Sequence, residues 1–523
     1  MHETKNAATA LALAWLASSA ACSVITGLNE FELSETASTG SGSSTSGTAG
    51  GGAGGHGGAG GHGGVGGYGG GSATSTGTGG AGGGETCGAP WANALGEATL
   101  AQPVALAVDA TDGVVFASSF KSPVTLDGMD LDGGSNGDVL VMRYDAEGAP
   151  VWVRSFGTDA GDEVDAATSV ALDASGNVLL TGRTHSDIDF GGGPFTLNGG
   201  NNGFIARLGP DGGYQWAHGL PTAVGLSIAP RTGGAVVAGY FMSAFTPPGG
   251  GDAVTYAGGE DAFLMALDNA GMAMFTRSFG GNSNERAHAV AVDGANNAVV
   301  VGQFDGTVDF GGENNSFTAN STDVFVVKTS VSGNTLWVRH WTGMNVQIAR
   351  AVARDSGNNI VVAGDFKDRI TFDANTEFNA SGGAWDIFLA KLTPNGVLLW
   401  AKGFANGGDQ QASAIHIDAA GRIFLTGTFK GTIDFGGGVT VTAGSKFNIF
   451  AAVFDADGNA LQVRAFPTDA QDQTGGAIAS DSCGNLVLGG TFKGLLDFGG
   501  GVSVTDGADR TFVAKLRPEP PLP

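Results

Sequence analysis

The feature that most constrains the fold of this chain is a four-segment unit that recurs seven times after Trp91. The first segment is short, rich in Ala and Val, and mostly ends in Asp. Its last residue falls at positions 109, 173, 229, 293, 355, 418 and 481. The steps between these positions are 64, 56, 64, 62, 63 and 63 residues. Such a fixed period indicates repeated supersecondary units that pack against one another.

Each unit reads as four β-strands. The second segment, such as VLLTG at 178–182, follows a tight turn such as DASGN, and Gly and Asn in so short a connection favour a hairpin because they tolerate positive φ. A longer loop carrying DFGG, as at 309–312, precedes the third segment, VFVVK at 324–328. Another short turn leads to the fourth, LWVRHWTG at 336–343. The unit is therefore predicted to be a four-stranded antiparallel meander.

Seven such meanders predict an all-β, seven-bladed β-propeller, since four strands in about 60 residues exceed one coil of a β-solenoid. Side-chain size agrees, because blades crowd near the axis and splay outward. The first segment is rich in Ala, and the fourth carries an aromatic residue at matching positions: Trp152, Trp216, Phe275, Trp337 and Trp400.

The chain ends supply the clearest sign of a closed ring. The last repeat stops after TFVAKLRPEPPLP without a fourth segment, whereas PWANALG at 90–96 matches that segment before the first repeat begins. We therefore expect an N-terminal outer strand to complete the last blade, which leaves neither terminal edge unpaired.

The three cysteines fit this closure. Cys22 belongs to the N-terminal export region, while Cys87 precedes the borrowed strand and Cys483 lies in the first turn of the last blade. The first turn of a meander and the start of its fourth strand lie on one face, so we predict a Cys87–Cys483 disulfide formed in an oxidising compartment. The alternative is two free thiols.

The N-terminal region predicts export. Residues 1–21 combine Lys5, an apolar stretch and small residues before Cys22, and resemble a bacterial lipoprotein signal in which Cys22 becomes acylated; ordinary cleavage before Cys22 is the alternative. Residues 22–37 would then form the lipidated segment. Residues 38–85 are almost wholly Gly, Ser, Thr and Ala, which predicts a disordered tether spanning roughly 35–40 Å, and residues 86–523 form the propeller.

The charge of the chain limits its partners. With 50 acidic and 25 basic residues the formal net charge is −25, so the average field repels phosphate backbones and anionic headgroups. Nucleic acid is excluded as an expected partner, and the membrane is expected to be contacted through the lipid anchor only.

With segments reading AVAVD, VLLTG, DFGGG, FVAKL and VWVRSFG, the chain resembles the bacterial SBBP-type seven-bladed β-propeller repeat over about residues 90–517. Blade three departs most, because Ala229 and Pro230 replace the Asp turn and TPPGGGD replaces DFGG. The resemblance implies a secreted or surface-anchored protein. It carries no catalytic residues over to this chain.

Acidic loops mark a candidate ligand-binding rim. Propeller ligands commonly lie near the channel, where the loops that follow strand four meet those between strands two and three. These loops supply Asp159, Asp162, Glu163, Asp165, Glu285, Asp409, Asp469 and Asp472. They indicate either a polar or cation-binding rim or ordinary solvated loops.

Two further segments have the alternation of calcium loops. DADGN at 455–459 places Asp455, Asp457 and Asn459 at alternate positions, and DLDGGSNGD at 130–138 offers Asp130 and Asp132. The Gly at the sixth position and the final Glu of a calcium loop are absent from the first, so a simple turn is the competing interpretation. No other cofactor is expected.

No short catalytic motif occurs: the sequence has no GxSxG, HExxH or Walker-type loop. The propeller histidines, among them His218, His288, His340 and His416, fall at unlike repeat positions. Of these, His288 and His416 are the candidates for facing the channel. A basic residue does recur in strand four, as Arg154, Arg277, Arg339, Lys402 and Arg464, and we expect it to pair with nearby acidic groups.

The tether, the ring and the missing catalytic set together favour a monomeric cell-surface binding, adhesion or scaffolding module that presents its loops to protein or glycan. Two alternatives remain open. One is a polysaccharide hydrolase or lyase with carboxylates at the channel mouth, since propellers support such chemistry without short motifs. The other is a purely structural surface protein. The expected location is the outer membrane or cell surface, or alternatively the medium.

Overall fold

The structure, a computed structural model, describes residues 88–517 apart from short gaps. The gaps are residues 98–103, 122–123, 127–128, 132–136, 158–163, 186, 196, 198–199, 381, 406 and 467–471. The signal peptide, Cys22, the tether and Cys87 lie outside the described residues, so the statements made about them above stay predictions.

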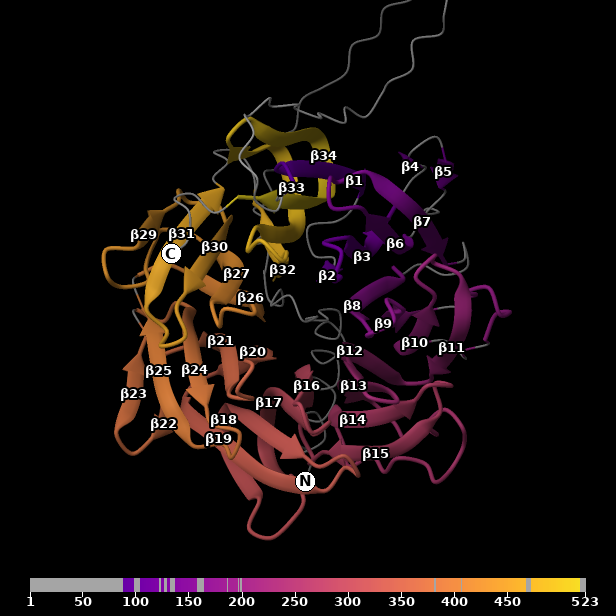
Figure 1. The fold of residues 1–523 in the computed structure, drawn as a ribbon. Helices are drawn as coiled ribbons and strands as arrows, with labels where there is room; N and C mark the ends of the chain where they lie inside the picture. The colour runs from indigo at the N-terminus through magenta and orange to yellow at the C-terminus, as the bar shows by residue number, and fades with distance from the viewer. Residues whose placement is uncertain are drawn as a thin grey trace, which may run out of the picture. The chain divides into compact units, whose positions relative to one another are not determined.

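Seven antiparallel sheets form the blades (Figure 1). Blade one holds β2 (Ala105–Val108), β3 (Val114–Phe120), β6 (Asp138–Tyr144) and β7 (Pro150–Phe156). Blade two holds β8 (Ala166–Leu172), β9 (Val178–Thr184), β10 (Asn202–Leu208) and β11 (Tyr214–Leu220). Blade three holds β12 (Ala223–Arg231), β13 (Gly234–Phe241), β14 (Asp261–Asp268) and β15 (Ala273–Phe279). Blade four holds β16 (Glu285–Val292), β17 (Ala298–Asp309), β18 (Ser316–Thr329) and β19 (Thr335–Met344).

The remaining blades repeat the pattern. Blade five holds β20 (Gln347–Arg354), β21 (Ile360–Phe366), β24 (Asp386–Leu392) and β25 (Leu398–Phe404). Blade six holds β26 (Gln410–Ile417), β27 (Ile423–Phe429), β30 (Asn448–Phe454) and β31 (Ala460–Phe466). Blade seven holds β32 (Thr474–Ser480), β33 (Leu486–Gly499), β34 (Val502–Leu516) and the N-terminal β1 (Trp91–Glu97).

Small hairpins extend the connections between second and third strands. They are β4 (Val124–Leu126) with β5 (Met129–Leu131), β22 (Arg369–Asp373) with β23 (Thr376–Asn379), and β28 (Thr432–Asp434) with β29 (Thr440–Thr442). The β22–β23 hairpin of blade five also pairs with β19, so the sheet of blade four has six strands.

The predicted closure is confirmed. β1 pairs antiparallel with β34, with Trp91 opposite Lys515 and Ala94 opposite Phe512, so the start of the described chain supplies the outer strand of its last blade. Figure 1 shows β2, β8, β12, β16, β20, β26 and β32 nearest the axis, as the small size of their side chains predicted. The chain is an all-β, seven-bladed propeller.

Alternating connections give the ring two unlike faces. The turns that join strands one to two and three to four lie on one face, here called the turn face. The connections from strand two to three and from strand four to the next blade lie on the other, here called the loop face.

The turns of the turn face use a recurring aspartate. Oδ1 of Asp173 accepts the backbone N–H groups of Ser175 (2.8 Å) and Asn177 (3.0 Å), and Gly176 adopts φ +75°. This Asx turn explains why Asp, Gly and Asn recur where the chain reverses.

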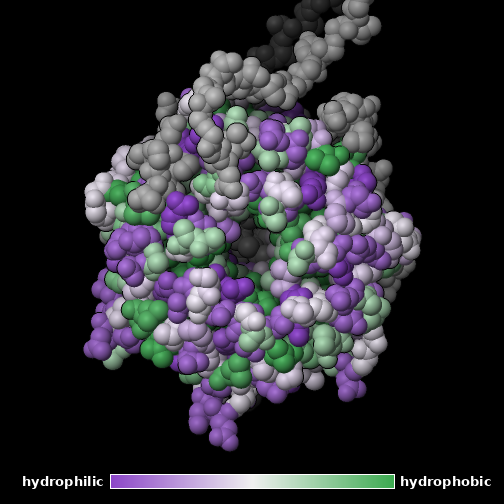
Figure 2. Space-filling view, viewed as in Figure 1, coloured by the Kyte–Doolittle hydropathy of each residue, from purple (hydrophilic) through white to green (hydrophobic). Residues whose placement is uncertain are grey.

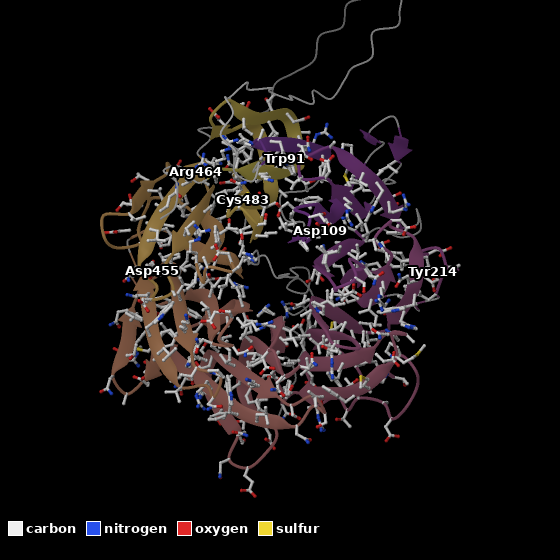
Figure 3. The ribbon with its side chains drawn as sticks, viewed as in Figure 1. Trp91, Asp109, Tyr214, Asp455, Arg464 and Cys483 are labelled. Atoms are coloured by element: carbon white, nitrogen blue, oxygen red, sulfur yellow. The ribbon has the colours of Figure 1, made fainter. Side chains whose placement is uncertain are left out.

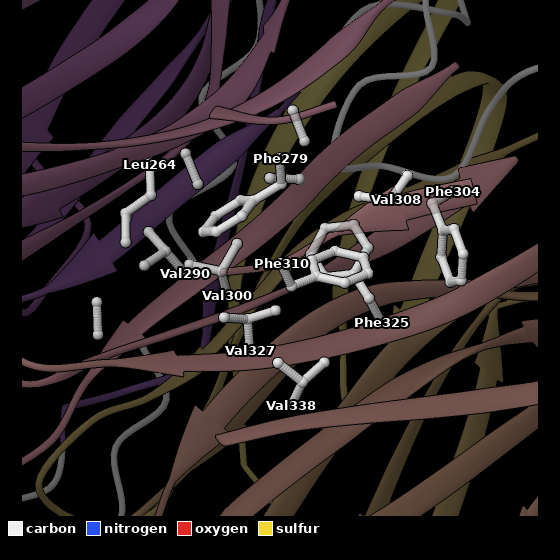
Figure 4. Close-up of a cluster of buried hydrophobic side chains, with 14 of the residues drawn as sticks. Leu264, Phe279, Val290, Val300, Phe304, Val308, Phe310, Phe325, Val327 and Val338 are labelled. Atoms are coloured by element: carbon white, nitrogen blue, oxygen red, sulfur yellow. The ribbon is translucent and has the colours of Figure 1, made fainter. Parts of the chain in front are cut away.

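The Phe of the DFGG loop packs between two neighbouring blades. Phe310, which is fully buried, packs with its ring centroid 5.9 Å from that of Phe279 in the preceding blade and 5.0 Å from that of Phe325 in its own (Figure 4). Phe190, Phe435 and Phe498 repeat the contact with Phe156, Phe404 and Phe466. The motif read from the sequence is thus a packing device.

A second device joins the blades on the turn face. The indole Nε1 of Trp152 donates to the carbonyl of Pro210 (2.9 Å), in the turn between strands three and four of the next blade. A Cβ built on Gly212 in that turn would lie 3.0 Å from the indole. The outer aromatic residue therefore lies against a turn glycine of its neighbour.

The basic residue of strand four reinforces this joint. Nε of Arg154, Arg277 and Arg339 donates to the carbonyl of the same turn glycine in the next blade, at 3.2, 2.9 and 2.6 Å. The prediction that these arginines pair with acidic groups is wrong. Backbone carbonyls exposed by a tight turn are the nearer acceptors, and a guanidinium reaches two of them with its several donors.

Among the described residues there is no helix with the length and hydrophobicity needed to cross a membrane.

Candidate binding face around the channel

The candidate site is the loop face, where the sequence predicted an acidic rim. Figure 2 shows the ring hollowed at its centre. Four of the predicted rim residues are described: Asp165, Glu285, Asp409 and Asp472. Asp165 is buried, and its Oδ1 accepts the N–H of His185 (3.2 Å). Asp159, Asp162, Glu163 and Asp469 lie outside the described residues, so their role remains a prediction.

Asp409 and Asp472 tie neighbouring loops together. Oδ1 of Asp409 accepts the N–H of Trp385 in blade five (3.2 Å), while Oδ2 lies 2.5 Å from Nζ of Lys430 in blade six. Asp472 likewise accepts the N–H of Phe447 (2.8 Å) and lies 3.4 Å from Nζ of Lys446. These carboxylates therefore hold each loop against the preceding blade.

Glu285 differs because it is buried, with 0% of its surface exposed. Oε2 accepts the N–H of Gly281 (2.7 Å), and Oε1 has no hydrogen-bond partner among the described residues. Burial raises the pKa of Glu285 to about 8, with a further contribution from the negative charges of Asp261 and Asp305. Burial also raises the pKa values of Asp261 and Asp305.

Sequence reasoning missed a ring of buried polar side chains beneath these loops. A β-bulge interrupts strand one at the same place in six blades, because its pairing with strand two shifts register there. At this bulge stand Thr168, His288, Arg350 and Ser413, all buried. The signal was present in the sequence, since each lies five residues before the last residue of its first segment.

The bulge residues bind within and between blades. Nε of Arg350 donates to Oδ2 of Asp365 (2.8 Å), and Oδ1 of Asp365 accepts the N–H of Ala412 in the next blade (2.6 Å). Thr168 donates to the carbonyl of Gly225 in the next blade (2.6 Å). Buried polar groups of this kind stabilise one arrangement of the strands only when they are paired.

The two histidines predicted to face the channel do not offer open imidazoles. His288 is fully buried, and burial holds its pKa well below the usual range, with the nearby cations Arg350 and Arg286 adding to the effect. His416 is half-buried with Nε2 3.1 Å from Oγ of Ser480, and burial lowers its pKa.

The possible calcium residues of blade six form a turn. Oδ1 of Asp455 accepts the N–H groups of Asp457 (2.9 Å) and Asn459 (2.8 Å), and Oδ2 accepts Nδ2 of Asn459 (2.9 Å). Partial burial opposes these bonds, but with the charge of Lys402 they lower the pKa of Asp455. Asp130 lies in β5 and Asp132 outside the described residues. Among the described residues no group of three or more His, Cys, Asp or Glu side chains is arranged to hold a metal.

A groove of about 830 Å³ lies on the opposite, turn face, at the joint of blades one and two. Arg143, Trp152 and Pro210 line it, and the exposed Glu147 and Val151 border it. Its inner side chains are already engaged, since Arg143 pairs with Asp109 and Trp152 donates to Pro210.

Comparisons with known proteins assign no function to the chain. No family model matches the chain. A WD repeat-containing protein, L264, of Acanthamoeba polyphaga mimivirus is 29% identical over 111 residues, which are 20% of this chain and 8% of that protein, so the chain spans less than a tenth of that relative.

Solved structures to which the chain shows similarity include the WD40 domain of Neurospora crassa Pan2, at 9% identity and a TM-score of 0.41 over 80% of this chain and 90% of that one. A protein of unknown function from Dyadobacter fermentans matches at 10% identity and a TM-score of 0.34, over 82% of this chain and 100% of that one. A Bacteroides caccae protein of unknown function matches at 11% identity and a TM-score of 0.31, over 55% of this chain and 78% of that one.

Proposed function

We propose that this chain is a cell-surface binding or scaffolding module that presents its loop face to a protein or glycan, tethered by an acylated Cys22 and the Gly-rich segment 38–85. The resemblance of its repeats to the SBBP type supports export, because that type is found in secreted or surface-anchored proteins. Its partners are then recognised outside the cell.

The observation that carries the proposal is how the loop-face carboxylates are used. Asp409 and Asp472 hold the loops in place through backbone N–H groups and lysines, and Glu285 is buried. A face whose acids fix its shape is preorganised for recognition, which lowers the entropy cost of binding.

The outer strands supply additional contact surface. In four blades, the residue just before the aromatic residue of strand four is apolar and exposed. These residues are Val151 (57%), Met274 (57%), Leu336 (52%) and Leu399 (51%). An exposed apolar side chain at the same repeat position in four blades supports a scaffold role for the outer strands.

One observation favours the alternative of a polysaccharide hydrolase or lyase. Glu285, with its raised pKa, has the protonation state that a general acid needs at neutral pH. Its burial opposes that role, since a general acid must come within hydrogen-bond reach of the substrate.

Binding screens of the full chain test the proposal. Glycan arrays and pull-downs from surface extracts should capture a partner, and the double variant Lys446→Ala, Asp472→Ala on the loop face should weaken capture. Glu147→Ala, on the turn face, is the matched control and should not. Measurable polysaccharide turnover without a captured partner would favour the hydrolase or lyase alternative. Loss of capture in Glu147→Ala alone would mean that the partner binds the turn face, which would contradict the proposal.

A further inference from the structure

One position at the start of strand one is a buried Glu or Gln in four blades. Eight residues before the last residue of the first segment stand Glu285 in blade four, Gln347 in blade five, Gln410 in blade six and Gln473 in blade seven. All four side chains are buried, each with 0% exposure.

Two of the glutamines show what this position does. Nε2 of Gln347 donates to the carbonyl of Arg369 (3.0 Å) and to that of Met344 (2.9 Å). Nε2 of Gln410 donates to the carbonyl of Thr432 (3.2 Å). The amide therefore fastens the loop that enters strand one to the hairpin between strands two and three of the same blade.

The backbone around Glu285 has the same form. The carbonyl equivalent to that of Arg369 belongs to Thr307, 62 residues earlier, and Gly281 is equivalent to Gly343 in the same way. A Cβ built on Gly343 would lie 1.9 Å from the oxygen of Arg369, and one built on Gly281 would lie 2.5 Å from the oxygen of Thr307. The acceptor that glutamine uses in blade five is thus also present in blade four.

An ionised glutamate cannot donate to that acceptor. Its Oε2 already accepts the N–H of Gly281, and its Oε1 is buried without a partner. A carboxylic acid has one O–H donor, so only neutral Glu285 matches the donor and acceptor pattern of a glutamine amide.

The charges around Glu285 favour the neutral form. Asp261 on β14, with Glu260 just before it, and Asp305 on β17 lie on the packed strands, and Asp323 on β18 pairs with His340 on β19 (2.6 Å). Arg286, the adjacent cation, is engaged by Glu260 (2.7 Å to Oε1). His288 and Arg350 form the layer beneath, where burial holds the pKa of His288 well below its usual range. Burial and the nearby acids raise the pKa of Glu285 to about 8.

We propose that Glu285 is a proton-dependent latch: protonated, it fastens the loop at 281–285 to the carbonyl of Thr307 as glutamine does in blades five and six, and on losing its proton it releases that loop from the loop face. Blade four then has a titratable joint where blades five and six have amide joints that do not titrate. This inference does not depend on the function proposed above.

The direction of the pH effect follows from the raised pKa. Folded protein retains a proton on Glu285 that the unfolded chain loses above its ordinary pKa of 4.5. The stabilisation is therefore complete at acid pH and is lost as pH rises through about 8. Above that value each further pH unit favours the deprotonated, released loop by about tenfold.

Hydrogen–deuterium exchange of the full chain between about pH 6 and pH 9, corrected for the intrinsic pH dependence of exchange, tests the latch. In the wild type we expect the peptides covering 281–286 and 304–309 to lose about tenfold protection as pH rises above 8. Glu285→Gln should abolish this loss, and Gln347→Glu should create it at 343–348 in blade five.

Glu313→Gln is the matched control, since Glu313 is exposed and its replacement removes the same charge from the same blade. It should behave as the wild type. Equal pH dependence in the wild type and Glu285→Gln would overturn the proposal, and so would a Gln347→Glu protein whose protection at 343–348 does not change with pH.

Discussion

Blade seven meets its two neighbours through unlike contacts. At the joint with blade one, the indole of Trp91 donates to the carbonyl of Ala146 (3.3 Å), and a Cβ built on Gly148 would lie 2.4 Å from the ring. At the joint with blade six, the same repeat position is Gln462, two residues before Arg464. Figure 3 labels Trp91 and Arg464.

The difference follows from where the chain ends. Blade seven has no turn between its third and fourth strands, because its fourth strand comes from the N-terminus. An aromatic residue at 462 would meet neither a turn glycine nor a turn carbonyl. Arg464 instead donates to the carbonyls of Phe498 and Arg517, the latter at 3.1 Å. The aromatic residue is thus present where its receiving turn exists.

Replacing the aromatic residue should have the largest effect. Trp91→Ala removes a buried side chain (9% exposed) from the joint that closes the ring, and we expect a loss of about 3–5 kcal/mol in the free energy of unfolding. Gln462→Ala, at the equivalent position with 8% exposure, should cost about 1 kcal/mol. Denaturant unfolding measures both, and equal losses would show that the two joints are alike.

The cation of the closing joint comes next. Nζ of Lys515 lies 2.7 Å from Asp481 and donates to Ala146 across the joint (3.2 Å), with 2% of the lysine side chain exposed. Lys515→Met should cost about 3 kcal/mol because it leaves the buried carboxylate of Asp481 without its counter-charge. The exposed pair Lys446–Asp472 is the control, and Lys446→Met should cost less than about 1 kcal/mol.

The predicted disulfide is a third way to test the closing joint. A Cβ on Gly88 would lie 3.4 Å from Nζ of Lys515, which contacts Asp481, two residues before Cys483. Peptide mapping without reductant should find Cys87 linked to Cys483, and reduction should cost about 2 kcal/mol. Cys22→Ser should leave that linkage intact, and a map with both thiols alkylated would disprove it.

Comparing alanine variants of two glycines separates the effect of contact with the indole from the effect of backbone strain. Gly148 (φ +85°) and Gly501 (φ +83°) both need a left-handed backbone, but a Cβ on Gly501 has nothing within 4 Å. Alanine at either site therefore carries the same strain, whereas only Gly148→Ala clashes with Trp91. We expect Gly148→Ala to cost about 1–3 kcal/mol more. Similar unfolding midpoints would mean that the indole moves aside freely.

The smallest effect is expected from calcium. Asp455, in the turn that receives Trp400 in the joint of blades five and six, uses both carboxylate oxygens in hydrogen bonds of the turn. We therefore expect calcium to leave the melting temperature of the wild type unchanged. Asp455→Ala should lower the free energy of unfolding by about 1 kcal/mol with or without calcium. A rise in the melting temperature of the wild type with calcium that is absent in Asp455→Ala would support a calcium site at Asp455.

The sequence alone determined the blade count, the strand order within each blade and the closure by residues 90–96. These depend on local patterning and on a period near 60 residues, which every repeat restates. The same periodicity would have revealed the bulge position of His288 and Arg350, had it been aligned residue by residue.

Only the tertiary structure decided what the recurring polar residues do. Asp409, Glu285 and Arg154 could each bind a ligand by residue type. In the structure Asp409 and Arg154 bond backbone groups of a neighbouring blade, and Glu285 accepts a backbone N–H of its own loop. Such partners carry no side-chain signature, and which carbonyl or N–H group lies within reach depends on how neighbouring sheets pack. That is why the repeats in the sequence determine the ring, while the pKa of Glu285 depends on its burial and on the acids that packing brings near it.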